Sequence, residues 1–251
     1  MDKLIAALTR LYLMPQAATP EALAQHFQGV HPLAVPLASD EGDTRAIVID
    51  FPPRRDVGPG QHWTDLCAVA NRLQEAFGFP APSVSISGAS SFRLWLSLAE
   101  SVPVGDARRL TALLRENHFP DLALQALDAV ELPPFLNPAS GKWAAFIHPG
   151  MGAAFTEEAG LDIRPPAAAQ LAFLEGLDSI GKTAFFDALA AMKQADAAPA
   201  AVQPAPALAT GDAGLLLKDA TLEDIVRHLH ARGIEPSFRH VLPRGDRERT
   251  A

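Results

Sequence analysis

The stretch that decides the fold covers residues 46–98 and contains three apolar segments, AIVIDFPP (46–53), SVSISG (83–88) and FRLWLSL (92–98). Each segment has the length and the β-branched or aromatic content of a strand. Between the first two, residues 63–77 place apolar side chains three and four apart, which predicts a helix that ends at Gly78. Residues 88–91 form a connection short enough for a hairpin. The order strand, helix, strand, strand predicts a sheet with helices packed on it.

The flanking sequence adds further helices and strands to this centre. Helical patterns cover residues 1–14, 20–27, 107–117 and, in one or two pieces, 165–193, and a strand-like segment covers 143–147. We therefore predict one α+β domain over residues 1–194, with a mixed β-sheet packed by helices.

Composition changes sharply near the C-terminus. Residues 195–214 are rich in Ala and Pro and almost free of large apolar side chains, which predicts a linker. Residues 215–251 hold one helical pattern, with apolar residues at Leu222, Ile225 and Leu229, followed by a tail. Because one helix is too small to form a domain, we expect it to dock on the main body or on a protein partner.

The chain as a whole has an ordinary globular composition, with 48% hydrophobic and 20% charged residues among 251. No run approaches the roughly 20 apolar residues that span a bilayer. The first residues lack the layout of a secretory signal, and there is a single cysteine, Cys67. These features predict a cytoplasmic bacterial protein without a membrane partner. The net charge of −8 argues against broad binding to phosphate backbones, so nucleic-acid contact needs a local patch or a bound cation.

Polar groups stand at the ends of the apolar segments. Asp50 lies where the first strand ends, Ser87 and Gly88 open the turn after the second, and Arg93 begins the third. A strand-end carboxylate can bind a divalent cation, a Ser-Gly turn can direct N–H groups at phosphates, and an arginine can bind phosphate through two hydrogen bonds. Each group also has a purely structural interpretation: a carboxylate that caps a turn, a plain hairpin turn, and a surface-paired arginine.

The order of these groups resembles a known family. A hydrophobic strand ending Asp-x-x-Pro, a helix, Gly-Phe-Pro, a strand ending Ser-Gly, and then aromatic-x-x-Trp is similar to the pattern of the archaeo-eukaryotic primase superfamily. The nearest branch is the primase-polymerase domain of bacterial end-joining ligases, and the resemblance covers residues 46–115. It implies that Asp50 binds Mg²⁺ or Mn²⁺ and that Ser87, Gly88 and Arg93 contact a nucleotide or nucleic acid.

The sequence also departs from the family pattern. Pro52 stands where the family has its second metal-binding carboxylate, Arg93 stands where it has a histidine, and two glycines of its turn are replaced. Asp128 and Glu131 are the candidates for its third carboxylate. Because these losses weaken a two-metal site, we predict a protein that binds nucleic acid or nucleotide without catalysis. Its expected role is that of an accessory in DNA replication, repair or mobile-element maintenance.

Two other function classes stay open. A rearranged metal site would support an active nucleotidyltransferase or primase, in which Asp50 is essential. Alternatively, the fold is the scaffold of a protein–protein adaptor that docks through the C-terminal helix. Two fragments, SGK (140–142) and GLDSIGKT (176–183), are phosphate-friendly. The first lacks the full phosphate-loop pattern and the second has helical sequence before it instead of a strand, so neither is interpreted as a phosphate loop.

Overall fold

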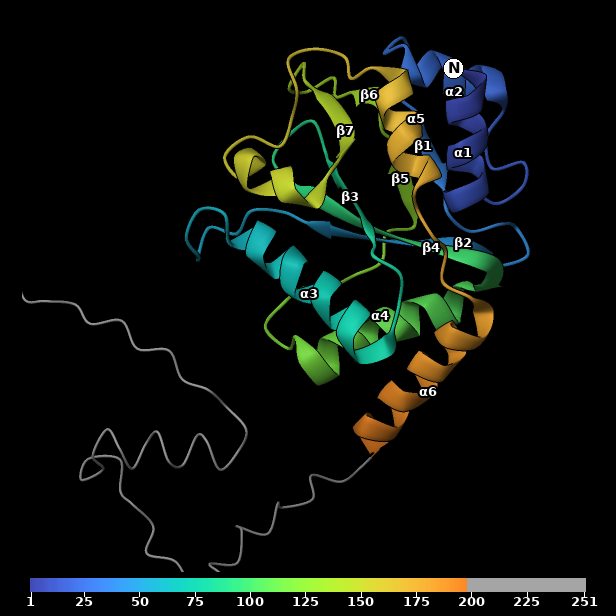
Figure 1. Ribbon diagram of the computed structural model, residues 1–251, viewed down its shortest axis with the longest axis vertical. Coiled ribbons are helices and arrows are strands. Elements are labelled where there is room, and N and C mark those ends of the chain that lie inside the picture. Colours follow the sequence, from blue (N-terminus) through green and yellow to red (C-terminus); the bar gives the residue numbers. More distant parts are fainter. Residues whose placement is uncertain (198–251) are drawn as a thin grey trace, which may run out of the picture. The chain divides into compact units, whose positions relative to one another are not determined.

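The computed structural model of the protein describes residues 1–197. The predicted C-terminal helix and tail, and all but the start of the predicted linker, lie outside the described residues. Figure 1 shows the elements, which are in chain order α1 (Asp2–Tyr12), α2 (Pro20–Phe27), β1 (Ala34–Pro36), β2 (Asp43–Phe51), α3 (Gln61–Phe77), β3 (Ser83–Ile86), β4 (Phe92–Pro103), α4 (Val104–His118), β5 (Ala129–Glu131), β6 (Phe135–Leu136), β7 (Trp143–Ile147), the 3₁₀ helix η1 (Pro149–Phe155), α5 (Ala167–Glu175) and α6 (Lys182–Ala197).

Five strands form the main sheet in the order β2-β4-β3-β7-β6, and β1 pairs with β5 in a separate two-stranded sheet. The α+β class is confirmed. All direct pairings in the main sheet are antiparallel, whereas the sequence led us to expect a mixed sheet. The reason is that β4 returns from its hairpin with β3 and pairs on its other edge with β2. The parallel relation expected from the strand–helix–strand order therefore holds between β2 and β3, which do not touch.

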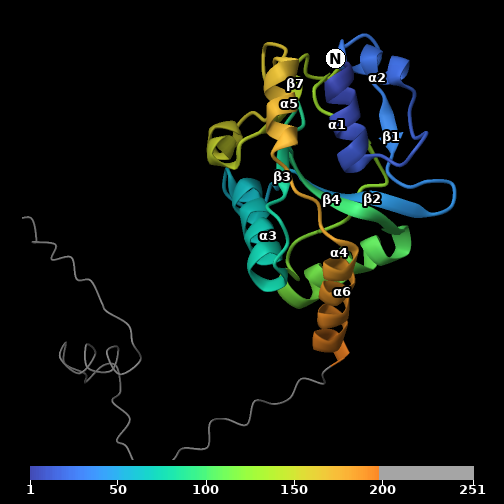
Figure 2. The same cartoon turned by 45° about the vertical axis from the view of Figure 1, so that its right-hand side comes forward.

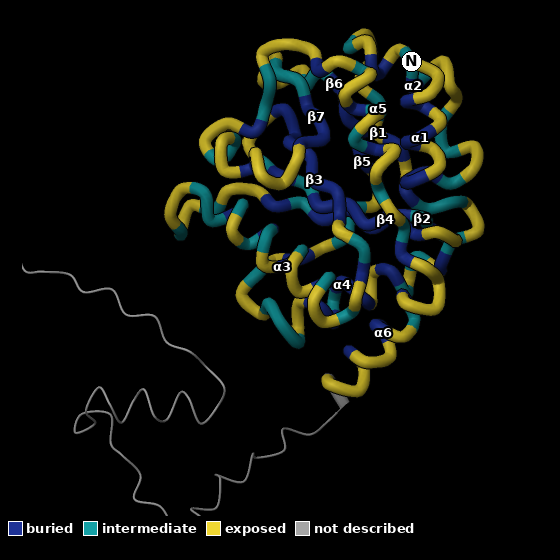
Figure 3. The backbone as a smooth tube through the Cα atoms, viewed as in Figure 1, coloured by how far each residue is buried: buried dark blue, intermediate teal, exposed yellow. Residues whose placement is uncertain are grey.

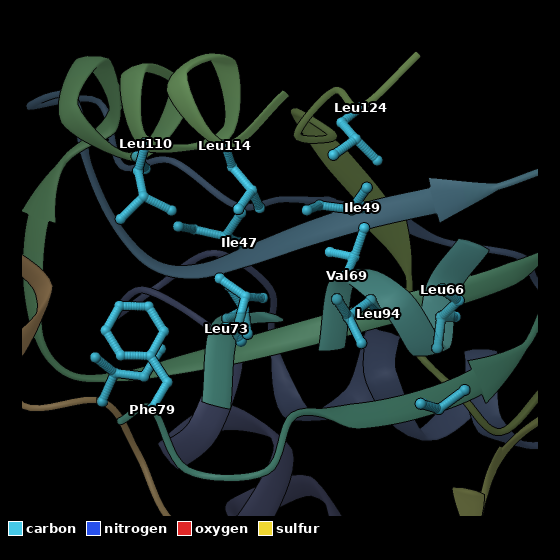
Figure 4. Close-up of a cluster of buried hydrophobic side chains, with 14 of the residues drawn as sticks. Ile47, Ile49, Leu66, Val69, Leu73, Phe79, Leu94, Leu110, Leu114 and Leu124 are labelled. Carbon is cyan, nitrogen blue, oxygen red and sulfur yellow. The ribbon is translucent and has the colours of Figure 1, made fainter. Parts of the chain in front are cut away.

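Helices α3, α4 and α6 cover one face of the main sheet (Figure 1). Strand residues at alternate positions point to this face, and each fully buried Leu or Ile contributes about 1.5–3 kcal/mol of burial free energy. Figure 4 shows part of this core, in which Ile47, Ile49 and Leu94 of the strands meet Leu66, Val69 and Leu73 of α3 and Leu110 and Leu114 of α4.

Helices α1, α2 and α5 cover the opposite face (Figure 2). Val48 and Trp95 point into this second core, which contains several polar atoms. The Trp95 Nε1–H group donates to Ser85 Oγ at 2.8 Å, and the Tyr12 hydroxyl shares a 2.7 Å hydrogen bond with Ser83 Oγ. Burial raises the pKa of Tyr12, so its hydroxyl stays neutral. The second core is thus apolar with its polar atoms paired.

Two buried side chains on this second face, Gln170 and His26, form hydrogen bonds with backbone N–H and carbonyl groups that no backbone group of residues 1–197 satisfies. Gln170 of α5 accepts the Phe146 N–H at 2.8 Å and donates to the Phe146 carbonyl at 3.0 Å. His26 accepts the Leu33 N–H on Nδ1 at 2.9 Å, and its Nε2 is 2.9 Å from the Leu132 carbonyl oxygen. Because an amide must donate and a carbonyl must accept, the His26 ring is neutral with its proton on Nε2. Burial is the main cause that lowers the pKa of His26.

Buried residues concentrate in the sheet and on the inward faces of the helices (Figure 3). The predicted helices over 1–14, 20–27, 63–77 and 107–117 are confirmed with small shifts of their ends, and so is the strand over 143–147. Within residues 1–197, no helix is both long enough and apolar enough to cross a bilayer.

Candidate functional site

Asp50 and Arg93 meet at one end of the sheet, where β2 ends and β4 begins. The two residues are direct partners in the β2–β4 pairing. Each lies two positions from a residue of the second core, Val48 and Trp95 respectively, so both side chains are on the face that α1, α2 and α5 cover. The sequence-predicted carboxylate and arginine are therefore neighbours on one surface of the sheet.

The Arg93 guanidinium lies between two carboxylates. Its Nε is 3.4 Å from Asp50 Oδ1, and its Nη2 is 3.1 Å from Glu131 Oε2. Its Nη1 donates to the Glu131 backbone carbonyl at 3.3 Å, and Ser91 Oγ donates to Asp50 Oδ1 at 3.0 Å. The Arg93 side chain is 15% exposed, against 30% and 35% for the two carboxylates. The cluster is thus partly shielded from water but still open to it.

Glu131 is the carboxylate that the fold adds to this cluster, whereas Asp128 is not part of it. Glu131 ends β5, whose pairing with β1 fixes its position. Asp128 instead forms an exposed ion pair with Arg108 of α4, with Nη2 and Oδ1 2.8 Å apart. The two candidates named from the sequence therefore have different ion-pair partners, and only Glu131 of the two contacts Arg93.

These residues fit a cation that arrives with a phosphate ligand better than a tightly held resident ion. Carboxylate oxygens are the ligands that Mg²⁺ and Mn²⁺ prefer. However, a guanidinium lies between Asp50 and Glu131, and within residues 1–197 no three His, Cys, Asp or Glu side chains are grouped to hold a metal. Mg²⁺ is often held by only one or two carboxylates together with substrate phosphates.

The Ser87–Gly88 turn lies next to the cluster, but it uses its N–H groups internally. Ser87 N–H donates to the Ser91 carbonyl at 3.0 Å, and Ser87 Oγ accepts the N–H groups of Ala89 and Ser91 at 3.3 and 3.1 Å. The Gly88 N–H donates to the Ala159 carbonyl at 2.8 Å. The predicted phosphate-binding turn therefore has its N–H groups already bonded, and a phosphate has to replace one of these partners.

Gly88 could not be another residue without movement of its surroundings. Its φ of +73° lies in the left-handed region, and a Cβ there would be 2.9 Å from the Lys142 carbonyl oxygen and 3.0 Å from the Ala144 nitrogen. In addition, Ser140 Oγ donates to the Gly88 carbonyl. The turn is thus packed directly on residues 137–144, which include the SGK fragment.

The phosphate-loop match at 176–183 has the wrong structural context. Gly176 caps the C-terminus of α5, and α6 begins at Lys182, so a helix precedes the match where a phosphate loop requires a strand. This confirms the interpretation from the sequence.

Sequence analysis missed the role of Ser91, which the hairpin places within hydrogen-bonding distance of Asp50. The only signal for it was its position one residue before β4. The choice between Asp128 and Glu131 also had no sequence signal, because neither lies in the same segment of chain as Asp50 or Arg93.

Comparison with known proteins gives a distant likeness among solved structures and no match by sequence. No protein-family model matches the chain, and no curated protein matches it. Among solved structures, the AEP domain of the cyanophage S-2L primase-polymerase is similar at 14% sequence identity and a TM-score of 0.37, over 69% of this chain and 97% of that one. At that identity and TM-score the likeness does not assign the chain to a family.

Proposed function

We propose that this protein binds a nucleotide, or the phosphates of a nucleic acid, at the cluster of Asp50, Arg93 and Glu131 together with a divalent cation. In this proposal it acts without catalysis, as an accessory in DNA replication, repair or mobile-element maintenance. The observation that carries the proposal is the convergence of these three side chains, from three separate strands, beside the Ser87–Gly88 turn.

The charge balance of the cluster indicates how phosphate would bind. Two carboxylates around one guanidinium leave a net negative charge, which repels a bare phosphate. A divalent cation on Asp50 and Glu131 reverses that sign and releases the Arg93 guanidinium, which can then bind a phosphate through two hydrogen bonds. Cation and phosphate should therefore bind cooperatively, each raising the affinity for the other.

The test is a pair of titrations on the wild-type protein and on Arg93→Ala. Fluorescence anisotropy measures binding of a labelled single-stranded DNA and of a fluorescent dATP analogue at low salt, with and without Mn²⁺. Calorimetry measures Mn²⁺ alone. We expect wild-type binding to need Mn²⁺ and to weaken with salt. Arg93→Ala should bind nucleotide at least about tenfold more weakly, the size expected for a charge-assisted pair.

The same variant provides a second readout with the opposite sign. Arg93→Ala removes the internal counter-ion of two carboxylates, so it should bind Mn²⁺ alone more tightly than the wild type does. Arg10→Ala, at an exposed position in the last turn of α1, is the matched control and should change neither affinity. Nucleotide binding that is equal in wild type and Arg93→Ala would exclude this cluster as the phosphate site.

One observation favours an active nucleotidyltransferase as the second candidate. Glu131 supplies a second carboxylate next to Asp50 although Pro52 occupies the family position for one. If two carboxylates suffice for catalysis, Mn²⁺-dependent nucleotide incorporation on a primed template should be measurable. Asp50→Ala and Glu131→Gln should each abolish it. Incorporation that survives both substitutions would come from a contaminating polymerase.

A further inference from the structure

Lys142 lies beside the Ser87–Gly88 turn and is held by two carboxylates from a single segment. Its Nζ is 2.7 Å from Glu158 Oε1 and 3.0 Å from Asp162 Oδ1. The lysine side chain is 23% exposed, whereas the two carboxylates are 59% and 86% exposed. Exposed ion pairs of this kind are weak, so another anion can displace these carboxylates.

The same segment also occupies the N–H group of the turn. Ala159, between the two acids, accepts the Gly88 N–H at 2.8 Å, and its own N–H donates to the Ala89 carbonyl at 3.2 Å. One short piece of chain therefore places oxygen atoms on the two groups that could bind a phosphate here, the Lys142 ammonium and the Gly88 N–H. We call residues 157–162 the acidic cover.

The acidic cover is in close contact with what lies beneath it. A Cβ on Gly160 would be 2.9 Å from the Lys142 Cβ and 3.2 Å from the Gly88 carbonyl carbon. Ala159 is fully buried, and Leu161 forms two backbone hydrogen bonds with Trp143. There is thus no room for a ligand between the acidic cover and the turn while the cover is in place.

We propose that Lys142 and the Gly88 N–H form a second phosphate-binding position next to the cluster of Asp50, Arg93 and Glu131, and that the acidic cover occupies it until a polyphosphate ligand displaces it. The inference rests on the proposed function, since the two positions would serve one ligand. They are joined through the turn, because Ser91 contacts Asp50 and Gly88 packs against the backbone of Lys142 and Ala144.

The two positions together select the class of ligand. In this proposal the triphosphate of a nucleotide, or successive phosphates of a nucleic-acid strand, contacts both positions. Orthophosphate can occupy only one, so it should compete poorly with the carboxylates of the acidic cover. The second position therefore favours chains of phosphate over single phosphate groups.

The first experiment removes the charge of the acidic cover and leaves its backbone in place. The double variant Glu158→Gln/Asp162→Asn is titrated with inorganic tripolyphosphate and Mn²⁺ by calorimetry, beside the wild type. We expect about three- to tenfold tighter binding, because two weak ion pairs no longer compete for Lys142. The control Asp40→Asn/Glu41→Gln makes the same change in net charge at exposed positions in another loop and should leave the affinity unchanged. Adding Lys142→Gln to the double variant should remove the gain.

The second experiment displaces the acidic cover by size instead of charge. Gly160→Ala places a methyl group against Lys142 and Gly88, so it should increase amide hydrogen exchange at residues 159–161 and tighten tripolyphosphate binding. Gly105→Ala is the control, since nothing lies within 4 Å of a Cβ there. Circular dichroism and the unfolding midpoint check that Gly160→Ala is folded.

The outcomes separate the two proposals. If neither the wild type nor the variants bind tripolyphosphate or nucleotide, the proposed function fails. If the wild type binds but Glu158→Gln/Asp162→Asn binds no more tightly, or if its gain in affinity survives the addition of Lys142→Gln, the proposed function stands and the second position at Lys142 is overturned. If the double variant gains as much affinity for orthophosphate as for tripolyphosphate, the second position exists but the proposed selection for polyphosphate is wrong.

Discussion

Replacing Gln170 by leucine tests whether a single side chain closes the edge of β7. Gln170 is 6% exposed, and its amide bonds to both the N–H and the carbonyl of Phe146, which is itself buried. Phe146 is opposite Ser85 in the β7–β3 pair. Because Gln170 binds both of its backbone groups, these groups point away from β3. In Gln170→Leu both groups lose their partner and no strand residue can replace it.

The size of the effect follows from these contacts. Leaving a buried polar group without a partner costs about 1–3 kcal/mol, so two groups cost roughly 2–6 kcal/mol. The leucine recovers about 1–2 kcal/mol through added apolar burial. Taking the middle of each range, we expect a net loss of about 2.5 kcal/mol from the free energy of unfolding, with limits of about 0 and 5 kcal/mol. This is a large part of the roughly 5–15 kcal/mol typical of a domain.

Urea denaturation followed by tryptophan fluorescence measures this loss, because the Trp95 ring lies beside that of Phe146, tilted to it, with ring centroids 5.4 Å apart. Gln25→Leu, at an exposed position of α2, is the control and should stay within about 0.5 kcal/mol of the wild type. A Gln170→Leu variant that is as stable as the wild type, or more stable, would refute the reasoning, since it would mean that water satisfies Phe146 equally well.

Two further predictions concern stability. Because burial lowers the pKa of His26 in the folded protein, the unfolded chain binds more protons below the ordinary histidine pKa of about 6.5. The free energy of unfolding should be unaffected by this group above that pH. At lower pH it should decrease by up to about 1.4 kcal/mol per pH unit. Urea midpoints between pH 7.5 and 5.5 should show the decrease, and His26→Gln should make it shallower. Gly152→Ala should destabilise the protein by about 1–3 kcal/mol, because its Cβ would lie 2.1 Å from the Trp63 ring, whereas Gly105→Ala should not; thermal melts compare the two, and equal midpoints would contradict the packing described.

Periodicity alone could predict most of the elements, because apolar spacing is a local property of the chain. Residues 63–77 become α3 and residues 143–147 become β7 for that reason. Which strands pair with each other was harder to predict, since pairing depends on contacts between distant segments. The hairpin of β3 and β4 is local and was predicted, whereas the pairing of β2 with β4, which places Asp50 opposite Arg93, has no local signal.

The candidate site shows the same division. Asp50, Ser87, Gly88 and Arg93 could be selected because each stands at the end of an apolar segment. Their partners were harder to predict, because they come from segments far along the chain: Glu131 could not be separated from Asp128 as a candidate, and Ala159 was not selected at all. The sequence therefore indicated where polar groups would lie and could not indicate which of their hydrogen bonds were already made.

The edges of the main sheet restrict how other molecules can approach it. The outer edge of β2 bonds to Ala38 near its start and to residues 126–127 near its end, and beyond the short strand β6 the edge of β7 is closed by Gln170. An open edge strand is the usual template for pairing with a second chain, both in aggregation and in recognition by strand addition. With these positions covered, pairing with the strand of a second chain is blocked at both ends of the β2 edge and at Phe146 of β7.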